Sequence, residues 1–174
     1  MDIGKNVDTE LLNSQDEFVM MLQRNESLIN RLCYALGDHS AYCTDELFQE
    51  VCIRLWRGWN DYKGIGLETT WIYKVTLNTI RMELRRKRSR VKLVCVDNNY
   101  LDSIADEARN PAVADLYGII DRLPWNERQL VYLYLDRLTA NEIANITGKT
   151  ETAVRQKIHR LMTKIKRKYE NNQE

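Results

Sequence analysis

The segment from Leu138 to Lys168 constrains the fold more than any other part of the chain, because it carries the signals of two short helices joined by a turn. Thr139, with Glu142 three residues later, forms a capping box that predicts a helix start, and Gly148 predicts the end of that helix. Thr150 predicts the start of a second helix. The apolar residues of the second helix recur at spacings of four, three and four, which places them on one face: Val154, Ile158, Leu161 and Ile165. The pattern is typical of a helix-turn-helix.

The opposite face of the second helix is polar and basic. Seven Lys and Arg residues fall between Arg155 and Lys168, and no Asp or Glu occurs from Thr152 to Lys168. A helix that packs on one face and presents amide, hydroxyl and guanidinium groups on the other fits the major groove of DNA. The alternative is a basic helical hairpin that is only solvated surface. The candidate DNA contacts are Thr150, Thr152, Arg155, Gln156, Lys157, His159, Arg160 and Lys164.

The distribution of charge supports a nucleic-acid partner, although the net charge of +1 by itself argues against one. Residues 1–50 carry ten acidic side chains against three basic ones, whereas residues 81–92 carry seven basic side chains and one acidic one. Together with the C-terminal helix, the second segment holds fourteen of the 26 Lys and Arg residues. Such asymmetry indicates one surface for a polyanion and another for a protein.

Several classes of protein are disfavoured by composition. No apolar run approaches the roughly 18 residues that cross a membrane, and the N-terminus lacks a signal-peptide pattern, so we expect a cytoplasmic protein with reduced cysteines and no membrane insertion. Cys33, His39, Cys43 and Cys52 lack the paired spacing of a zinc site, so we expect no metal and no cofactor. The two histidines have no plausible nucleophile partner and no glycine-rich phosphate loop occurs, so the chain is not expected to be an enzyme.

Two further helices are expected in the first half of the chain. After a loose start, a capping box from Ser14 to Glu17 begins a long amphipathic helix that ends at Gly37. Thr44 caps the next helix, whose apolar residues cover about half of its circumference. An isoleucine within the polar stripe hints at a protein partner, although a lone exposed apolar residue is equally normal. The polar stripe consists of Glu46, Gln49, Glu50, Ile53 and Arg57.

A glycine-containing loop at residues 58–68 separates these helices from a third one that starts near Thr69. Its first half has the β-branched composition of a strand, but the continuation MELRRKR favours a helix. One face of this helix holds Trp71, Val75, Asn78 and Met82. The side chains left available to a partner are Tyr73, Lys74, Arg81, Arg85 and Arg88.

With the remaining segments, the sequence predicts an all-α fold of two small helical domains. Residues 91–110 have no sustained period and are interpreted as a linker. Pro111 is a good helix start, Leu123-Pro124 ends that helix, and another runs from about Trp125 to Arg137. The expected domains are therefore residues 14–90 and 111–170.

The order of these segments resembles an extracytoplasmic-function (ECF) sigma factor of bacterial RNA polymerase. The resemblance rests on DELFQEVCIRLWRGWNDY, ETTWIYKVTLNTIRMELRRKRS and LPWNERQLVYLYLDRLTANEIANITGKTETAVRQKIHRLMTKIK, and it covers nearly everything from Ser14 to Lys168. It implies that the first domain is sigma region 2, which binds the polymerase clamp and the minus-ten element. It implies that the second is region 4, which binds the polymerase flap and the minus-thirty-five element. The implied partners are core RNA polymerase, promoter DNA and an anti-sigma factor.

The resemblance also implies roles for particular residues. The polar stripe from Glu46 to Arg57 matches the clamp-binding helix, and TETAVRQKIHR matches the helix that reads the minus-thirty-five element. The loop 59–68 matches the segment that captures an unstacked base, but it is glycine-rich here, and Thr152 replaces the usual glycine or serine of the reading helix. The implied minus-ten contacts are Trp59, Tyr62, Lys63, Tyr73, Lys74, Asn78, Arg81, Arg85 and Arg88.

Two other classes remain open from the sequence. An autonomous helix-turn-helix regulator would use the first 90 residues for sensing or dimerisation, and a cytosolic adaptor would need no DNA contact. Aromatic and basic residues interleave between Trp59 and Arg90. Unpaired bases need stacking surfaces, whereas duplex DNA does not, so this interleaving favours a sigma factor that melts promoters.

Overall fold

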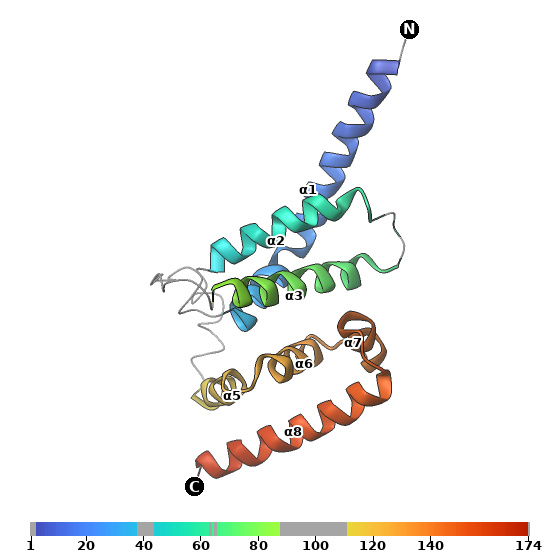
Figure 1. The fold of residues 1–174 in the computed structure, drawn as a ribbon. Coiled ribbons are helices and arrows are strands. Elements are labelled where there is room, and N and C mark those ends of the chain that lie inside the picture. The colour runs from blue at the N-terminus through green and yellow to red at the C-terminus, as the bar shows by residue number, and fades with distance from the viewer. Residues whose placement is uncertain (1–2, 38–43, 63, 65, 88–110, 174) are drawn as a thin grey trace.

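The computed structural model describes residues 3–37, 44–62, 64, 66–87 and 111–173 of the chain, and these residues form seven helices and no strand. Two bundles lie one above the other, with α8 along the outer edge of the second (Figure 1). The expected all-α class is therefore confirmed. The first bundle contains α1 (Ile3–Leu36), α2 (Thr44–Trp59) and α3 (Glu68–Lys87), and the second contains α5 (Pro111–Asp121), α6 (Trp125–Leu135), α7 (Ala140–Thr147) and α8 (Glu151–Gln173).

The core of the first bundle joins the apolar faces of its three helices. Met21 and Leu32 of α1, Val51 of α2 and Ile80 of α3 are almost completely buried. The chain leaves α1 at Gly37, whose N–H donates to the Cys33 carbonyl at 2.9 Å. A Cβ at residue 37 would lie 2.4 Å from that carbonyl oxygen, so only glycine fits.

The helix-turn-helix is present as expected. Thr139 and Glu142 form both bonds of the capping box, and Gly148 adopts the left-handed conformation with a φ of 69°. The Thr150 hydroxyl accepts from the N–H of Ala153 at 3.3 Å and so caps α8. The four apolar residues expected on the inner face of α8 are all buried: Val154, Ile158, Leu161 and Ile165.

One expectation about the first bundle was wrong. Helix α1 already begins at Ile3, not at Ser14. Extending an existing helix costs much less than nucleating one, so a good cap within the sequence need not be its start. In α3, Asn78 and Met82 are exposed, whereas Thr76 and Thr79 are buried. The Thr79 hydroxyl donates to the Val75 carbonyl at 2.7 Å, so this buried hydroxyl has a hydrogen-bond partner within its own helix.

Some expectations concern residues outside the described part of the chain. These are the linker 91–110, the candidate contacts Lys63 and Arg88, and two members of the rejected zinc set, His39 and Cys43. Within the described residues, no helix is both long enough and apolar enough to cross a membrane.

Candidate nucleic-acid interface

The outer face of α8 is the most basic surface of the second bundle. Thr152, Gln156 and His159 are exposed, one turn apart along the helix, and Arg155 is exposed beside them. Arg155 forms an ion pair with Glu151 on the preceding turn. The structure thus brings together, on one solvent-facing side, the hydroxyl, amide, imidazole and guanidinium groups that the sequence predicted for base reading.

Two of the lysines predicted as DNA contacts also contact an acidic residue of α6. Lys157 and Lys164 both pair with Glu127, the latter at 3.3 Å between Nζ and Oε2. The hydrogen bond from Lys157, assisted by Lys164, lowers the pKa of the Glu127 carboxyl. The carboxylate therefore fixes α8 against α6 and holds two ammonium groups at the edge of the basic face.

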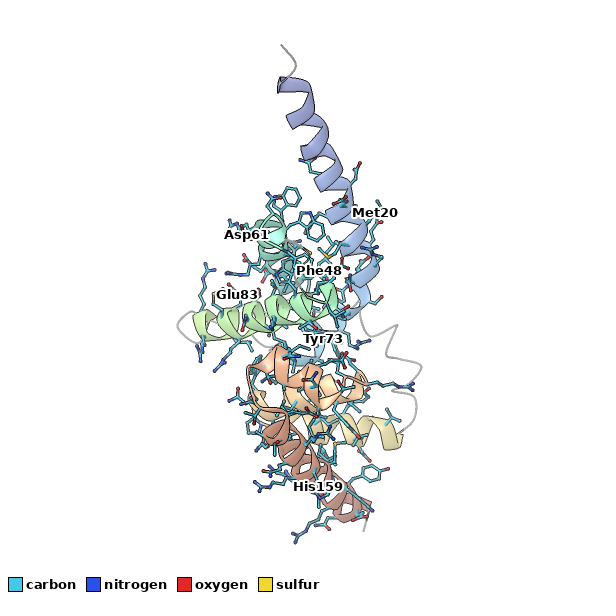
Figure 2. All side chains as sticks on the ribbon, turned by 90° about the vertical axis from the view of Figure 1, so that its right-hand side faces the viewer. Met20, Phe48, Asp61, Tyr73, Glu83 and His159 are labelled. Carbon is cyan, nitrogen blue, oxygen red and sulfur yellow. The ribbon has the colours of Figure 1, made fainter. Side chains whose placement is uncertain are left out.

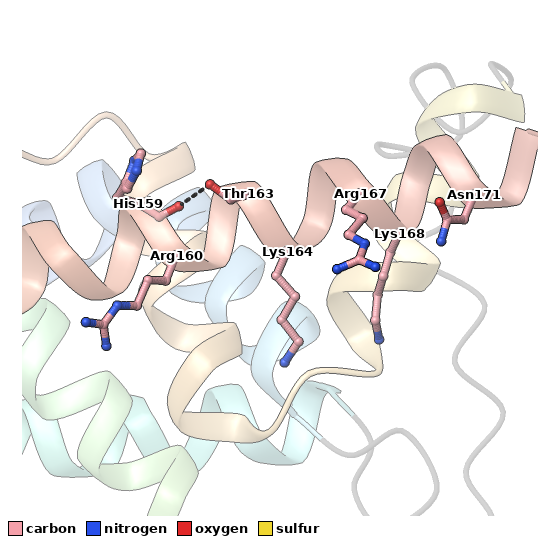
Figure 3. A pocket seen from close by; sticks show the side chains of 7 residues that line it. All are labelled: His159, Arg160, Thr163, Lys164, Arg167, Lys168 and Asn171. Carbon is pink, nitrogen blue, oxygen red and sulfur yellow. Dashed lines mark hydrogen bonds between the residues drawn. The ribbon is translucent and has the colours of Figure 1, made fainter.

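The basic face extends further along α8 than the sequence analysis predicted. A shallow groove of about 600 Å³ follows the helix (Figure 3). The Thr163 hydroxyl donates to the His159 carbonyl within it at 3.0 Å. Arg167 and Lys168 were missed, although the spacing of seven and eight residues from Arg160 already placed them on the same face. The groove is lined by His159, Arg160, Thr163, Lys164, Arg167, Lys168 and Asn171.

The turn between α2 and α3 is supported by an aromatic cluster. Tyr62 stacks on Trp71 with ring centroids 4.8 Å apart, and its hydroxyl donates to the Gly66 carbonyl at 3.0 Å. Trp59 lies 6.1 Å from Tyr62. Gly64 and Gly66 have φ angles of 68° and 94°, which glycine adopts without strain. The turn thus combines stacked aromatic rings with two glycines in the left-handed region.

The face of α3 expected to follow DNA is only partly free. Lys74, Asn78 and Arg85 are exposed, and the Arg81 guanidinium carbon lies 5.8 Å from the ring centroid of Trp125 in α6. The expectation that Tyr73 is available to a partner is wrong for this arrangement, because Tyr73 is 3% exposed. Its hydroxyl donates to Asp136 of the second bundle at 2.8 Å, a contact between domains that sequence periodicity within one helix does not reveal.

The outer face of α2 carries the stripe predicted for a protein partner. Glu46, Gln49 and Arg57 are exposed, and Ile53 keeps 44% of its surface in solvent. Trp56 was not singled out from the sequence, yet it is 43% exposed and packs edge-on against Phe18 with ring centroids 4.9 Å apart. Trp56 follows Ile53 by three residues, and this helical spacing was the signal that could have placed both side chains on the same face. An exposed isoleucine and tryptophan beside acidic groups are typical of a protein-binding face.

Cys33 and Cys52 are the free cysteines among the described residues. Burial raises the pKa of the Cys33 thiol to about 12 and that of Cys52 to about 11. Across the residues that the structure describes, no group of three or more metal-ligating side chains comes together.

Comparisons with known proteins identify both bundles. A family model described as Sigma-70 region 2 matches residues 21–90, and one described as Sigma-70, region 4 matches residues 114–165. A solved structure described as CnrH in complex with the cytosolic domain of CnrY shares the fold, with a TM-score of 0.65, 17% identity and coverage of 90% of each chain. No match was found among curated proteins.

The chain belongs to the sigma-70 family of sigma factors, with a region 2 followed by a region 4. It is a factor that binds core RNA polymerase and directs the initiation of transcription at promoters. An autonomous regulator is disfavoured because a region 2 precedes the helix-turn-helix. The domain limits at residues 14, 90, 111 and 170 remain predictions.

Proposed function

We propose that the chain carries out promoter recognition through three separate surfaces. The α2 face binds the clamp of core polymerase, the α2–α3 turn and α3 bind the melted minus-ten strand, and α8 reads the minus-thirty-five duplex. The observation that carries this assignment is the division of the exposed side chains. Apolar and acidic groups meet on α2, stacking rings gather at the turn, and cations line α8.

Base reading on α8 is assigned to Thr152, Arg155, Gln156 and His159, while Thr150 caps the helix near the DNA backbone. Arg160 faces the basic groove and is assigned to phosphate binding. Lys157 and Lys164 are assigned to phosphates as well, although Glu127 shares their charge. An ion pair at the rim of an interface can orient lysines without neutralising the whole surface.

Binding to the polymerase is tested by Glu50→Arg combined with Ile53→Asp. Replacing a central interface residue typically costs about 2 kcal/mol or more, and this pair reverses a charge and removes an apolar contact. We expect the folded double variant to lose co-purification with core polymerase and to support no promoter-specific run-off transcription.

Asp115→Arg on α5 is the matched control, because it makes a similar charge reversal on an exposed residue of the other bundle. It should bind core polymerase like the parent protein. Normal binding by a folded Glu50→Arg, Ile53→Asp variant would remove the α2 face from the proposal. Trp56→Ala extends the test to the neighbouring aromatic residue and should weaken binding in the same direction.

The proposed role also implies where the protein acts, how it acts and how it is regulated. The protein acts in the cytoplasm, where polymerase and promoters are, and it works by binding and has no catalytic site of its own. The solved structure that shares its fold is a complex with the cytosolic domain of another protein. By that analogy the present chain is regulated by an anti-sigma factor, which a pull-down with the full chain as bait would identify.

A further inference from the structure

Leu67, directly before α3, is the most exposed large apolar side chain among the residues that the structure describes. It keeps 66% of its surface in solvent, whereas the other exposed large apolar side chains range from 38% to 53%. Burying a leucine side chain stabilises a folded protein, and Leu67 forgoes most of that gain. It belongs neither to the buried core nor to the partly buried residues packed against it.

The same residue is a poor start for a helix. Leu67 occupies the N-cap position, because α3 begins at Glu68 and the Leu67 carbonyl accepts from the Trp71 N–H at 3.2 Å. This position favours Ser, Thr, Asp and Asn, whose side-chain oxygen accepts from the first N–H groups of the helix, and leucine is among the least favourable residues there. Helices α7 and α8 of this chain use threonine, at Thr139 and Thr150. A residue that breaks two local rules without packing in the core indicates a functional position.

The backbone on both sides of Leu67 is anchored. The carbonyl of the preceding residue, Gly66, accepts from the Tyr62 hydroxyl at 3.0 Å. The carboxylate of the following residue, Glu68, accepts from the Asn25 side chain of α1 at 3.4 Å. The exposed leucine is therefore presented from a fixed point, so that little backbone freedom is lost when it binds.

Leu67 adjoins the aromatic cluster that is assigned to base capture. Trp71, one turn further along α3, stacks on Tyr62 with ring centroids 4.8 Å apart. In Figure 2, Asp61 marks this turn on the first bundle, away from His159 on α8. A captured base leaves the stack, and the neighbouring base pair is then left with an uncovered face. Proteins that hold DNA unstacked insert apolar wedges, leucine among them, into such gaps.

We propose that Leu67 is an apolar wedge that fills the gap left by the captured base and covers the face of the neighbouring base pair. This inference rests on the proposed role of the α2–α3 turn in binding the melted strand. The wedge stabilises the junction between paired and unpaired DNA. Its contribution is therefore largest when polymerase has to open a duplex and small when the minus-ten segment is already unpaired.

The test compares Leu67→Ser, Leu67→Ala and Leu67→Met in the full chain with core polymerase. The probe is a promoter duplex selected from random DNA by the parent holoenzyme, with 2-aminopurine in its minus-ten segment to report opening. A second template carries the same promoter with a mismatched, pre-melted minus-ten segment. We expect the serine and alanine variants to open the duplex about tenfold or more slowly and to transcribe the pre-melted template like the parent. Leu67→Met keeps the apolar bulk and should open the duplex at close to the parent's rate.

Stability separates this role from a structural one. Serine supplies the missing cap, so the urea midpoint of Leu67→Ser should lie at or above that of the parent although promoter opening is slower. Leu135→Ser is the matched control, because it removes an exposed leucine from the other bundle, and it should open the duplex normally.

Parent-like opening by folded Leu67→Ser and Leu67→Ala variants would overturn the wedge. Equal losses on the duplex and the pre-melted template would overturn it as well, because they would assign Leu67 to the single strand itself. A lowered urea midpoint for Leu67→Ser would contradict the claim that this leucine is kept at the expense of stability. Failure of the proposed function has a different signature, since the parent itself would then give no transcript from either template.

Discussion

Two glycines show how strongly the effect of one residue depends on its surroundings. At Gly37 a Cβ would meet the Cys33 carbonyl oxygen at 2.4 Å and a Leu47 methyl at 3.3 Å. At Gly118, inside α5, a Cβ would meet nothing within 4 Å. The same substitution therefore has opposite expected signs at the two positions.

We expect Gly37→Ala to lower the free energy of unfolding by about 1–3 kcal/mol, because backbone blocks the new methyl group. Gly118→Ala should raise it by about 0.5–1 kcal/mol, because alanine loses less conformational entropy in a helix. Urea unfolding followed by circular dichroism measures both. Equal effects of the two substitutions would show that the helix end at Gly37 relaxes around a methyl group.

Periodicity identified the helices well and their tertiary contacts poorly. The inner stripe of α8 and the capping box of α7 follow from local spacing, and both are present. Tyr73 is buried and donates to Asp136, 63 residues later in the chain, a contact that no pattern within α3 reveals. Within α6, Tyr132 and Leu133 are buried whereas Tyr134 and Leu135 are exposed.

The contact between α6 and α8 predicts a response to pH. The pKa of Glu127 is lowered in the folded protein by hydrogen bonds from Lys157 and Lys164. A lowered folded-state pKa means that this pairing stabilises the protein above the unfolded value of 4.5 and is lost as the pH falls through the folded value. We expect Glu127→Gln to reduce stability at neutral pH and to flatten the loss of stability on acidification.

Urea midpoints measured at neutral pH and at about pH 4 test this expectation. Glu170→Gln is the control, because Glu170 forms a more exposed pair with Lys166 at 3.8 Å. Exposed pairs of this kind contribute about 0–1 kcal/mol, so the control should stay close to the parent. A parent-like pH profile for Glu127→Gln would indicate that the two lysines are oriented by other contacts.

At the scale of the whole molecule, the surfaces assigned to polymerase, duplex and single strand are separated in space but joined by the contact between the bundles. The α2 face proposed to bind the clamp and the α8 face proposed to read the duplex are exposed, whereas Tyr73 of α3 is buried.

Capture of a base at the α2–α3 turn is tested by Tyr62→Ala and Tyr62→Phe. The alanine variant loses both the stack on Trp71 and the hydrogen bond to Gly66, whereas the phenylalanine variant loses only the hydrogen bond. Stacking of a base on an aromatic ring contributes about 1–3 kcal/mol. We expect Tyr62→Ala to reduce permanganate reactivity of promoter thymines by about tenfold or more, with little change in closed-complex binding, and Tyr62→Phe to keep most of the reactivity. Equal losses in both variants would assign the effect to the Gly66 hydrogen bond and the shape of the turn, whereas normal melting by Tyr62→Ala would place base capture elsewhere.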